Sequence, residues 1–208
     1  MNATAYHRKK QPDLVRQAVL DCASHMAAQE GLARVSIQAV AEAAGVTKGG
    51  VFHHFPNKKA LVAAVFEQLI ARLDQDIDAH LSVDAVQHGR FTRAYVRVTF
   101  TDHLRQQNEA WQALCMSMAN DPDGQKMWAQ WMQSRLNRHA DTDSDPMLEV
   151  VRFAADGAWL ALMAGLDQAV IKDVSALCER LLALTQPPQP SRMADEPPCL
   201  LNSSLRLR

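Results

Sequence analysis

The spacing of apolar residues restricts the fold of this 208-residue chain more than any other feature of its sequence. Apolar side chains recur at steps of three and four residues, which places them on one side of an α-helix. A half-buried strand needs strict alternation instead, and no segment alternates in that way. The chain is therefore predicted to be all-α. Helical spacing runs through residues 13–29, 37–44, 58–80, 91–106, 109–119, 125–139, 146–166 and 168–185.

Two of the expected helices are short and lie close together in the sequence. Ser36 can cap the first, which ends at Gly45, and Thr47 can cap the second, which ends near His54. A proline then interrupts the helical pattern, and a long helix begins at Lys58. Two short helices joined by a tight turn are typical of the helix-turn-helix, whose second helix enters the major groove of DNA.

The second short helix has the residue types that such a contact needs. Lys48 can reach a phosphate or a guanine edge, and Gly49 and Gly50 have no side chains to hold the backbone away from the groove. Thr47 can offer its hydroxyl and the first helical amides to a phosphate. Lys58 adds a further expected phosphate contact.

The segment from Val35 to Leu61, VSIQAVAEAAGVTKGGVFHHFPNKKAL, resembles the DNA-binding segment of the TetR family of transcriptional regulators. Family members carry a Ser or Thr, an Ala-Gly-Val turn, a short recognition helix ending in Tyr-x-His-Phe, and a lysine at the start of the fourth helix. This sequence matches at Ser36, at residues 44–46, at residues 53–55 and at Lys58. The resemblance adds a specific family to the helix-turn-helix interpretation.

The resemblance implies a three-helix DNA-binding domain over residues 1–60, with its motif at about 36–55. It also implies a larger helical domain over residues 61–185 that binds an effector and forms a dimer. The DNA contacts that it implies come from Ser36, Gln38, Thr47, Lys48, Gly49, Gly50, Phe52, His53 and Lys58.

Some of these contacts leave alternatives open. Phe52 replaces the usual tyrosine of the family, so the hydroxyl that commonly contacts a phosphate is missing. Gln38 could be an ordinary surface residue, whereas His54 is expected to pack beneath the helix. Base reading is therefore expected to depend on Gln38, Lys48 and His53.

Charge is unevenly distributed along the chain. Residues 1–60 carry eight Lys or Arg against four Asp or Glu, although the whole chain has 22 basic and 23 acidic residues. A basic end on an otherwise acidic molecule suits a DNA partner. The four cysteines are scattered, so no disulfide framework, metal site or cofactor is expected. The sequence shows no apolar run long enough to span a membrane and no secretory leader, which predicts a cytoplasmic protein with no membrane partner.

The helix expected at Met147–Leu166 is apolar around most of its circumference. Such a helix must be covered on two sides, and we expect its own core on one side and a second copy of the chain on the other. TetR-family proteins are similar in forming dimers through their last two long helices. The residues expected at this homodimer interface are Trp159, Leu162, Met163, Val174, Leu177 and Leu181. A dimer also suits a palindromic operator in double-stranded DNA.

Aromatic and methionine residues are frequent between the fourth helix and this interface. In the family, such helices enclose a pocket for a small and often hydrophobic effector, and this resemblance implies Tyr95, His103, Trp128 and Trp131 as lining residues. A stripe of this kind can equally be ordinary core. The proline-rich segment 186–208 is expected to be a disordered tail.

Together these features predict a sequence-specific transcriptional regulator, most simply a repressor that a small effector releases from its operator. Two alternatives from other classes stay open: an enzyme that uses the apolar half as an active site, and a helical interaction protein with a non-functional helix-turn-helix. The sequence contains no nucleophile elbow, phosphate loop, paired carboxylates or metal cluster, so no catalytic residues are assigned.

Overall fold

The computed structural model describes residues 3–104 and 109–187, and every regular element among them is a helix. This confirms the predicted all-α class. The elements are α1 (Ala3–Glu30), α2 (Ile37–Ala43), α3 (Lys48–His54), α4 (Lys58–Val83), α5 (Arg90–Leu104), α6 (Glu109–Ala119), α7 (Pro122–Arg138), α8 (Ala140–Asp143), α9 (Pro146–Met163), α10 (Asp167–Val170) and α11 (Val174–Leu184).

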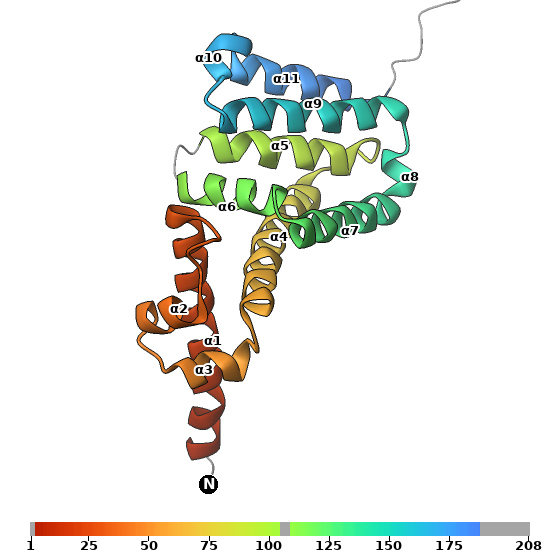
Figure 1. Cartoon of the computed structure of the whole chain (residues 1–208). Coiled ribbons are helices and arrows are strands. Elements are labelled where there is room, and N and C mark those ends of the chain that lie inside the picture. Colours follow the sequence, from red (N-terminus) through yellow and green to blue (C-terminus); the bar gives the residue numbers. More distant parts are fainter. Residues whose placement is uncertain (1–2, 105–108, 188–208) are drawn as a thin grey trace, which may run out of the picture.

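The molecule has a small head and a larger body (Figure 1). Helices α1 to α3 form the head, α5 to α11 form the body, and α4 runs from the head into the body. With 26 residues, α4 is about 39 Å long at 1.5 Å per residue. This single helix therefore connects the head to the body.

The head is held together by one apolar cluster. Val19 on α1, Val40 on α2, Val51 on α3 and Leu61 on α4 are all fully buried within it. Each of these helices presents its apolar residues at three- and four-residue steps, so all four can share one core. The short α2 and α3 depend on this packing, because isolated helices of their length are unstable in water.

The body is built around α5. Residues 91–96 are buried on every side, enclosed by α4, α9 and α11. The guanidinium of Arg93 is also buried here and donates to Asp84 and to the carbonyl oxygen of Thr185. It thereby ties the end of α11 to the turn between α4 and α5.

The last helical segment differs from the sequence prediction. A single helix was expected over residues 168–185, but the chain forms α10, breaks at residues 171–173, and resumes as α11. Asp173 causes the restart, because its side chain accepts a hydrogen bond from the amide of Ala176 and caps the new helix. The tail beyond residue 187 lies outside the described residues.

Candidate DNA-binding surface

The helix-turn-helix forms with the caps that the sequence predicts. The Ser36 hydroxyl accepts a hydrogen bond from the Ala39 amide at 3.1 Å, and the Thr47 hydroxyl accepts one from the Gly50 amide at 3.0 Å. Between the two helices Gly45 adopts a φ of +65°, which a residue with a side chain rarely tolerates. The tight turn between α2 and α3 is thus fixed by local chemistry.

The outward face of α3 consists of Lys48, Gly49, Phe52 and His53, all of which are exposed. Helical spacing places these four residues on one side, while Val51 on the opposite side is fully buried in the head core. The ammonium of Lys48 lies 5.9 Å from the centroid of the Phe52 ring. This face carries a cation, a bare stretch of backbone and two rings.

The two glycines of α3 are not both required by the protein itself. Neither has a positive φ, and a Cβ added at Gly49 would meet nothing closer than the Thr47 hydroxyl at 3.9 Å. At Gly50 the same hydroxyl would lie at 3.3 Å, so that position is tighter. The folded chain therefore gives no steric reason for a glycine at position 49.

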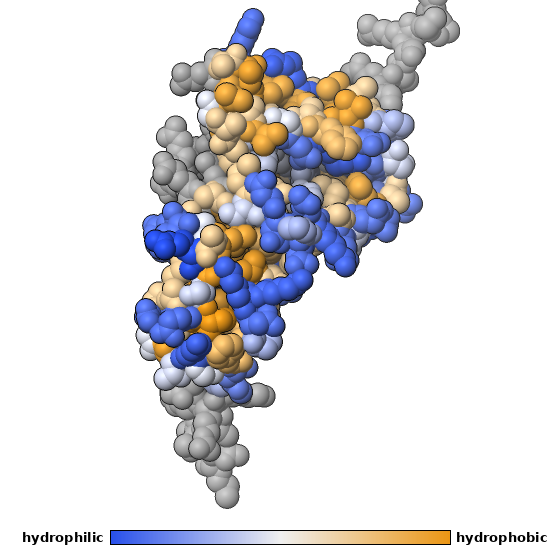
Figure 2. All heavy atoms as spheres, in the orientation of Figure 1, coloured by the Kyte–Doolittle hydropathy of each residue, from blue (hydrophilic) through white to orange (hydrophobic). Residues whose placement is uncertain are grey.

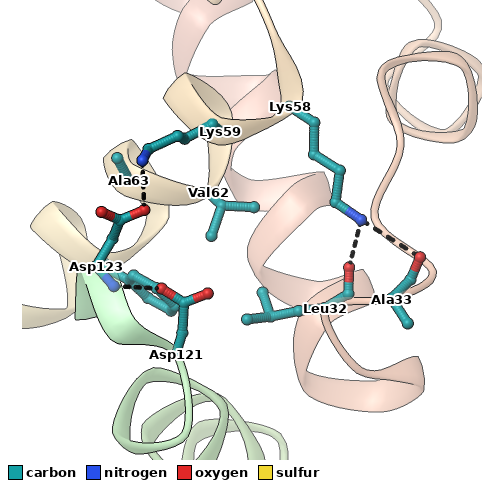
Figure 3. A pocket seen from close by; sticks show the side chains of 9 residues that line it. Leu32, Ala33, Lys58, Lys59, Val62, Ala63, Asp121 and Asp123 are labelled. Atoms are coloured by element: carbon teal, nitrogen blue, oxygen red, sulfur yellow. Dashed lines mark hydrogen bonds and ion pairs between the residues drawn. The ribbon is translucent and has the colours of Figure 1, made fainter. Parts of the chain in front are cut away.

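The lysines at the start of α4 have different partners (Figure 3). The Lys58 ammonium donates to the carbonyl oxygens of Leu32 at 2.8 Å and Ala33 at 3.4 Å, and so joins α4 to the turn before α2. An ammonium has three donors, so one remains for a phosphate. Lys59 pairs with Asp123 on α7 at 2.7 Å, and the hydrogen bond from this exposed pair raises the pKa of Lys59.

Gln38 and Ser36 lie on α2 and at its cap. Gln38 is exposed, and its side-chain amide donates to Glu42 at 2.5 Å. Ser36 is half-buried and uses its hydroxyl oxygen as the helix cap. Both side chains therefore already have a hydrogen-bond partner within the protein.

The caps of α2, α3 and α4 differ from three caps in the body. The first turns of α2, α3 and α4 contain no acidic residue, and their caps are the neutral residues Ser36, Thr47 and Asn57. In the body, α7, α9 and α11 are capped by Asp121, Asp145 and Asp173, whereas α8 begins after His139 and the first turn of α5 has no acidic residue. A carboxylate normally stabilises a helix start, so its absence from the head fits a partner that is itself an anion.

The residues predicted to line an effector pocket gather in one cluster of the body. Trp128 and Trp131 lie with their ring centroids 4.9 Å apart, and both pack against the core cluster that contains Tyr95. The Tyr95 hydroxyl donates to Asp156 at 2.5 Å, and the Trp131 indole donates to Asp74 at 2.6 Å. The side chain of His103 lies outside the described residues.

This cluster contains ionisable groups. Burial, together with the neighbouring Asp156 charge, raises the pKa of Tyr95 well above its usual value. Burial also raises the pKa of Asp156, although the Tyr95 hydrogen bond opposes this change. Two grooves, of about 490 and 520 Å³, lie along α4 near the head, and neither is lined by Tyr95, Trp128 or Trp131.

The predicted interface residues lie mainly on the inner side of α9 and α11. Leu162 and Leu181 are buried in the protomer's own core, and the other four residues are half-buried. The outward face of α9 carries a different set, namely Val150, Phe153, Gly157 and Leu160. Figure 2 shows hydrophobic residues gathered at the end of the body where α9 to α11 lie. A helix that is apolar all round does not reveal from sequence which side faces inward.

One ion-pair network in the body was not predicted from the sequence. The buried guanidinium of Arg135 on α7 bonds to Asp74 at 2.7 Å through its Nε and to Asp78 at 2.6 Å, both on α4. The two aspartates are four residues apart and so share a helix side, which was the available signal. The hydrogen bond from Arg135 lowers the pKa of Asp78.

The described residues contain no group of three or more His, Cys, Asp or Glu side chains that could hold a metal ion. Among the same residues, no helix is long and apolar enough to cross a membrane.

Comparison with known families matches both parts of the chain. The family "Bacterial regulatory proteins, tetR family" matches residues 19–65, and "Tetracyclin repressor-like, C-terminal domain" matches residues 89–186. The HTH-type transcriptional repressor KstR2 of Mycolicibacterium smegmatis is 25% identical over 73% of this chain and 80% of its own length. The HTH-type transcriptional regulator AcrR of Shigella flexneri is 36% identical over 28% of this chain, which spans only 27% of that relative.

Solved structures share the fold. A TetR family member, SCO1917 of Streptomyces coelicolor A3, aligns with a TM-score of 0.65 and 20% identity over 83% of this chain and 99% of its own. The multidrug binding protein EbrR, complexed with malachite green, aligns with a TM-score of 0.65 and 20% identity over 83% of this chain and 98% of its own. Because one family accounts for both the helix-turn-helix and the helical body, the chain belongs to the TetR family of transcriptional regulators.

Proposed function

We propose that the protein binds a palindromic operator as a homodimer in the cytoplasm and represses transcription until a small hydrophobic effector releases it. The outward face of α3 is the observation that carries this proposal. It presents Lys48 and the bare backbone of Gly49 on a helix whose other side is fixed by Val51 in the core. A short helix with small residues and a cation on its exposed side can enter the major groove and approach the bases.

The outward face of α9 supports the homodimer. Phe153 is 69% exposed, and Val150 and Leu160 beside it are more than half exposed. Gly157 lies between them, where an added Cβ would meet nothing within 4 Å of the same protomer. A second α9 can approach closely at such a position, which would cover the three apolar side chains. Two copies related by a twofold axis would present two α3 helices to half-sites about 34 Å apart.

The aromatic cluster around Trp131 supports an effector site. Trp131 donates to Asp74 on α4, the helix whose first turn joins the head through Lys58. An aromatic effector that entered beside Trp128 and displaced Trp131 would break this bond and move α4. Coupling of 1 to 3 kcal/mol, roughly a 5- to 150-fold change in operator affinity, is typical of such systems. The relatives EbrR and SmeT have been solved with malachite green and triclosan, and both ligands are aromatic.

The DNA-binding function is tested with Lys48→Ala. On a duplex that the protein enriches from a random library, we expect this variant to bind at least tenfold more weakly by fluorescence anisotropy, because one cation leaves the α3 face. Helicity and dimerisation should not change.

Lys126→Ala is the matched control, since it removes an exposed lysine from α7 in the body. It should bind the duplex as the wild type does. Equal affinities of the wild type, Lys48→Ala and Lys126→Ala for the duplex would show that Lys48 on α3 does not contact the DNA.

A further inference from the structure

Phe52 exposes an apolar ring where a soluble helix normally carries a polar residue. It is 43% exposed, and it lies on the side of α3 that points away from the head core. Its aromatic character serves no packing in that core, which is filled on this helix by Val51 and bordered by Phe55. Because Phe52 shares this face with Lys48 and Gly49, its ring would meet whatever the face binds.

Helical spacing leaves a gap over Gly49, between the side chains of Phe52 and His53, which we call the notch. Gly49 precedes Phe52 by three residues and His53 by four, so its bare backbone lies between the two rings. A Cβ at Gly49 would have open space around it, because its nearest neighbour is the Thr47 hydroxyl at 3.9 Å. The Lys48 ammonium lies 5.9 Å from the centroid of the Phe52 ring. The notch is therefore apolar on one wall and lacks a side chain at its floor.

The chemistry of the major groove limits what can fill such a notch. Base edges in this groove are hydrogen-bond donors and acceptors, with one exception, the 5-methyl group of thymine. A phenylalanine cannot hydrogen-bond to the polar edges, and it gains free energy only by removing apolar surface from water. The methyl group of a pyrimidine is the one apolar feature that the groove offers.

We propose that Phe52 and the bare backbone of Gly49 form a site for the 5-methyl group of thymine, and that Phe52 thereby determines base specificity in each half-site. This inference rests on the proposed function, since it requires α3 to lie in the major groove. It also explains why a phenylalanine can stand where the family usually has a tyrosine, because a ring that contacts a methyl group needs no hydroxyl. Phe52 is then a base-reading residue and not a phosphate contact.

The test removes single methyl groups from the DNA. In the operator enriched by the wild-type protein, each thymine is replaced by deoxyuridine, one symmetric pair at a time, and affinity is measured by anisotropy. Replacement of one particular symmetric thymine pair should weaken wild-type binding by about fourfold for each methyl group removed, or about fifteenfold for the two half-sites together. The same replacement should have no effect on Phe52→Ala and should keep its effect on Phe52→Leu, which retains an apolar side chain.

Two further readouts separate base reading from other roles. Phe52→Ala should leave the salt dependence of binding unchanged, because it removes no phosphate contact. At the position sensitive to deoxyuridine, the protein should bind a duplex with a 5-methylcytosine·guanine pair more tightly than one with cytosine·guanine. This comparison separates the effect of the methyl group from that of the thymine O4.

Two results would overturn the inference. One is an operator in which no thymine methyl group matters, and the other is an equal deoxyuridine effect in wild type and Phe52→Ala. Both leave the wild type bound to DNA, so they differ from failure of the proposed function, in which no duplex would bind at all.

Discussion

At the scale of single residues, Gly49 is a position where folding would favour an alanine, whereas the proposed DNA contact favours glycine. Glycine weakens a helix by about 1 kcal/mol relative to alanine, yet the chain has room for a Cβ at this position. No contact described within the protomer therefore offsets this loss of helix stability. In the proposed function, a close approach of Gly49 to the DNA would offset it, since such an approach needs a position without a side chain.

Gly49→Ala should consequently move stability and binding in opposite directions. We expect the free energy of unfolding to rise by up to about 1 kcal/mol in urea titrations, because alanine favours the helix. We expect operator affinity to fall roughly tenfold, because the new methyl group crowds the interface.

Ser134→Ala on the exposed side of α7 is a suitable control for this experiment. It should also favour its helix while leaving operator affinity unchanged. A Gly49→Ala variant that bound as tightly as the wild type would show that α3 does not lie against DNA at this position.

At the scale of elements, the contact between α4 and α7 holds the long helix that joins head and body. Arg135 is the centre of this contact, since its buried guanidinium satisfies both Asp74 and Asp78 on α4. Removing the buried cation leaves Asp78 without this partner and leaves Asp74 with only the hydrogen bond from the Trp131 indole. The ends of α4 in the head and in the body therefore depend on a common anchor.

Arg135→Gln should lower the free energy of unfolding by about 1 to 3 kcal/mol, less than for a fully buried pair because both aspartates are partly exposed. The measurement is urea unfolding followed by circular dichroism. Arg138→Gln, which removes an exposed arginine three residues later on α7, should change stability by less than 0.5 kcal/mol, a typical surface value. Equal losses in the two variants would contradict the anchoring role.

The same contact predicts a pH dependence. The hydrogen bond from Arg135 lowers the folded-state pKa of Asp78, so the contribution of this group is fully present above its unfolded pKa of about 3.9. It is lost as pH falls through the lower folded-state value. Stability should therefore decrease below about pH 4, and Asp78→Asn should show a shallower decrease in urea titrations at pH 5 and pH 3. Identical pH profiles would exclude Asp78 as a source of acid sensitivity.

The elements differ in how far the sequence could predict them. The limits of α2 and α3 were predictable because their signals are local: Thr47 caps α3, and Gly45 ends α2 in a conformation suited to glycine. The start of α1 was not, since a helix was expected from residue 13 but α1 begins at Ala3 and contains Pro12. The break before α11 was missed because the Asp173 cap interrupts a continuous apolar stripe. The inner and outer sides of α9 could not be told apart, since Leu162 and Phe153 are equally apolar and only packing decides which is buried.

At the scale of the whole molecule, the head lies at one end and α9 to α11 lie at the other (Figure 1). In the proposed dimer through α9, both heads would be free to reach DNA, and α4 in each copy would carry changes in the body to α3. The aromatic cluster around Tyr95 and Trp131 lies between these two ends. This arrangement suits a regulator in which an event in the body changes the spacing of two reading helices.

Phe153→Glu should separate the dimer, because it places a charge in the centre of the apolar face. We expect the wild type to sediment as a dimer and the variant as a monomer at micromolar concentration, with operator affinity at least a hundredfold weaker because the second half-site no longer contributes. Gln133→Glu, which adds the same charge to an exposed position on α7, should remain dimeric. If Phe153→Glu also remained dimeric, the interface would lie elsewhere on the protomer.

The central claim is that two copies of the α3 face read one symmetric DNA site. Selection of bound sequences from a random duplex library by the purified wild-type protein at moderate salt tests it most directly. We expect enrichment of a single palindrome whose half-sites lie one helical turn, or a multiple of a turn, apart. Failure to enrich any sequence by folded, dimeric protein would contradict it.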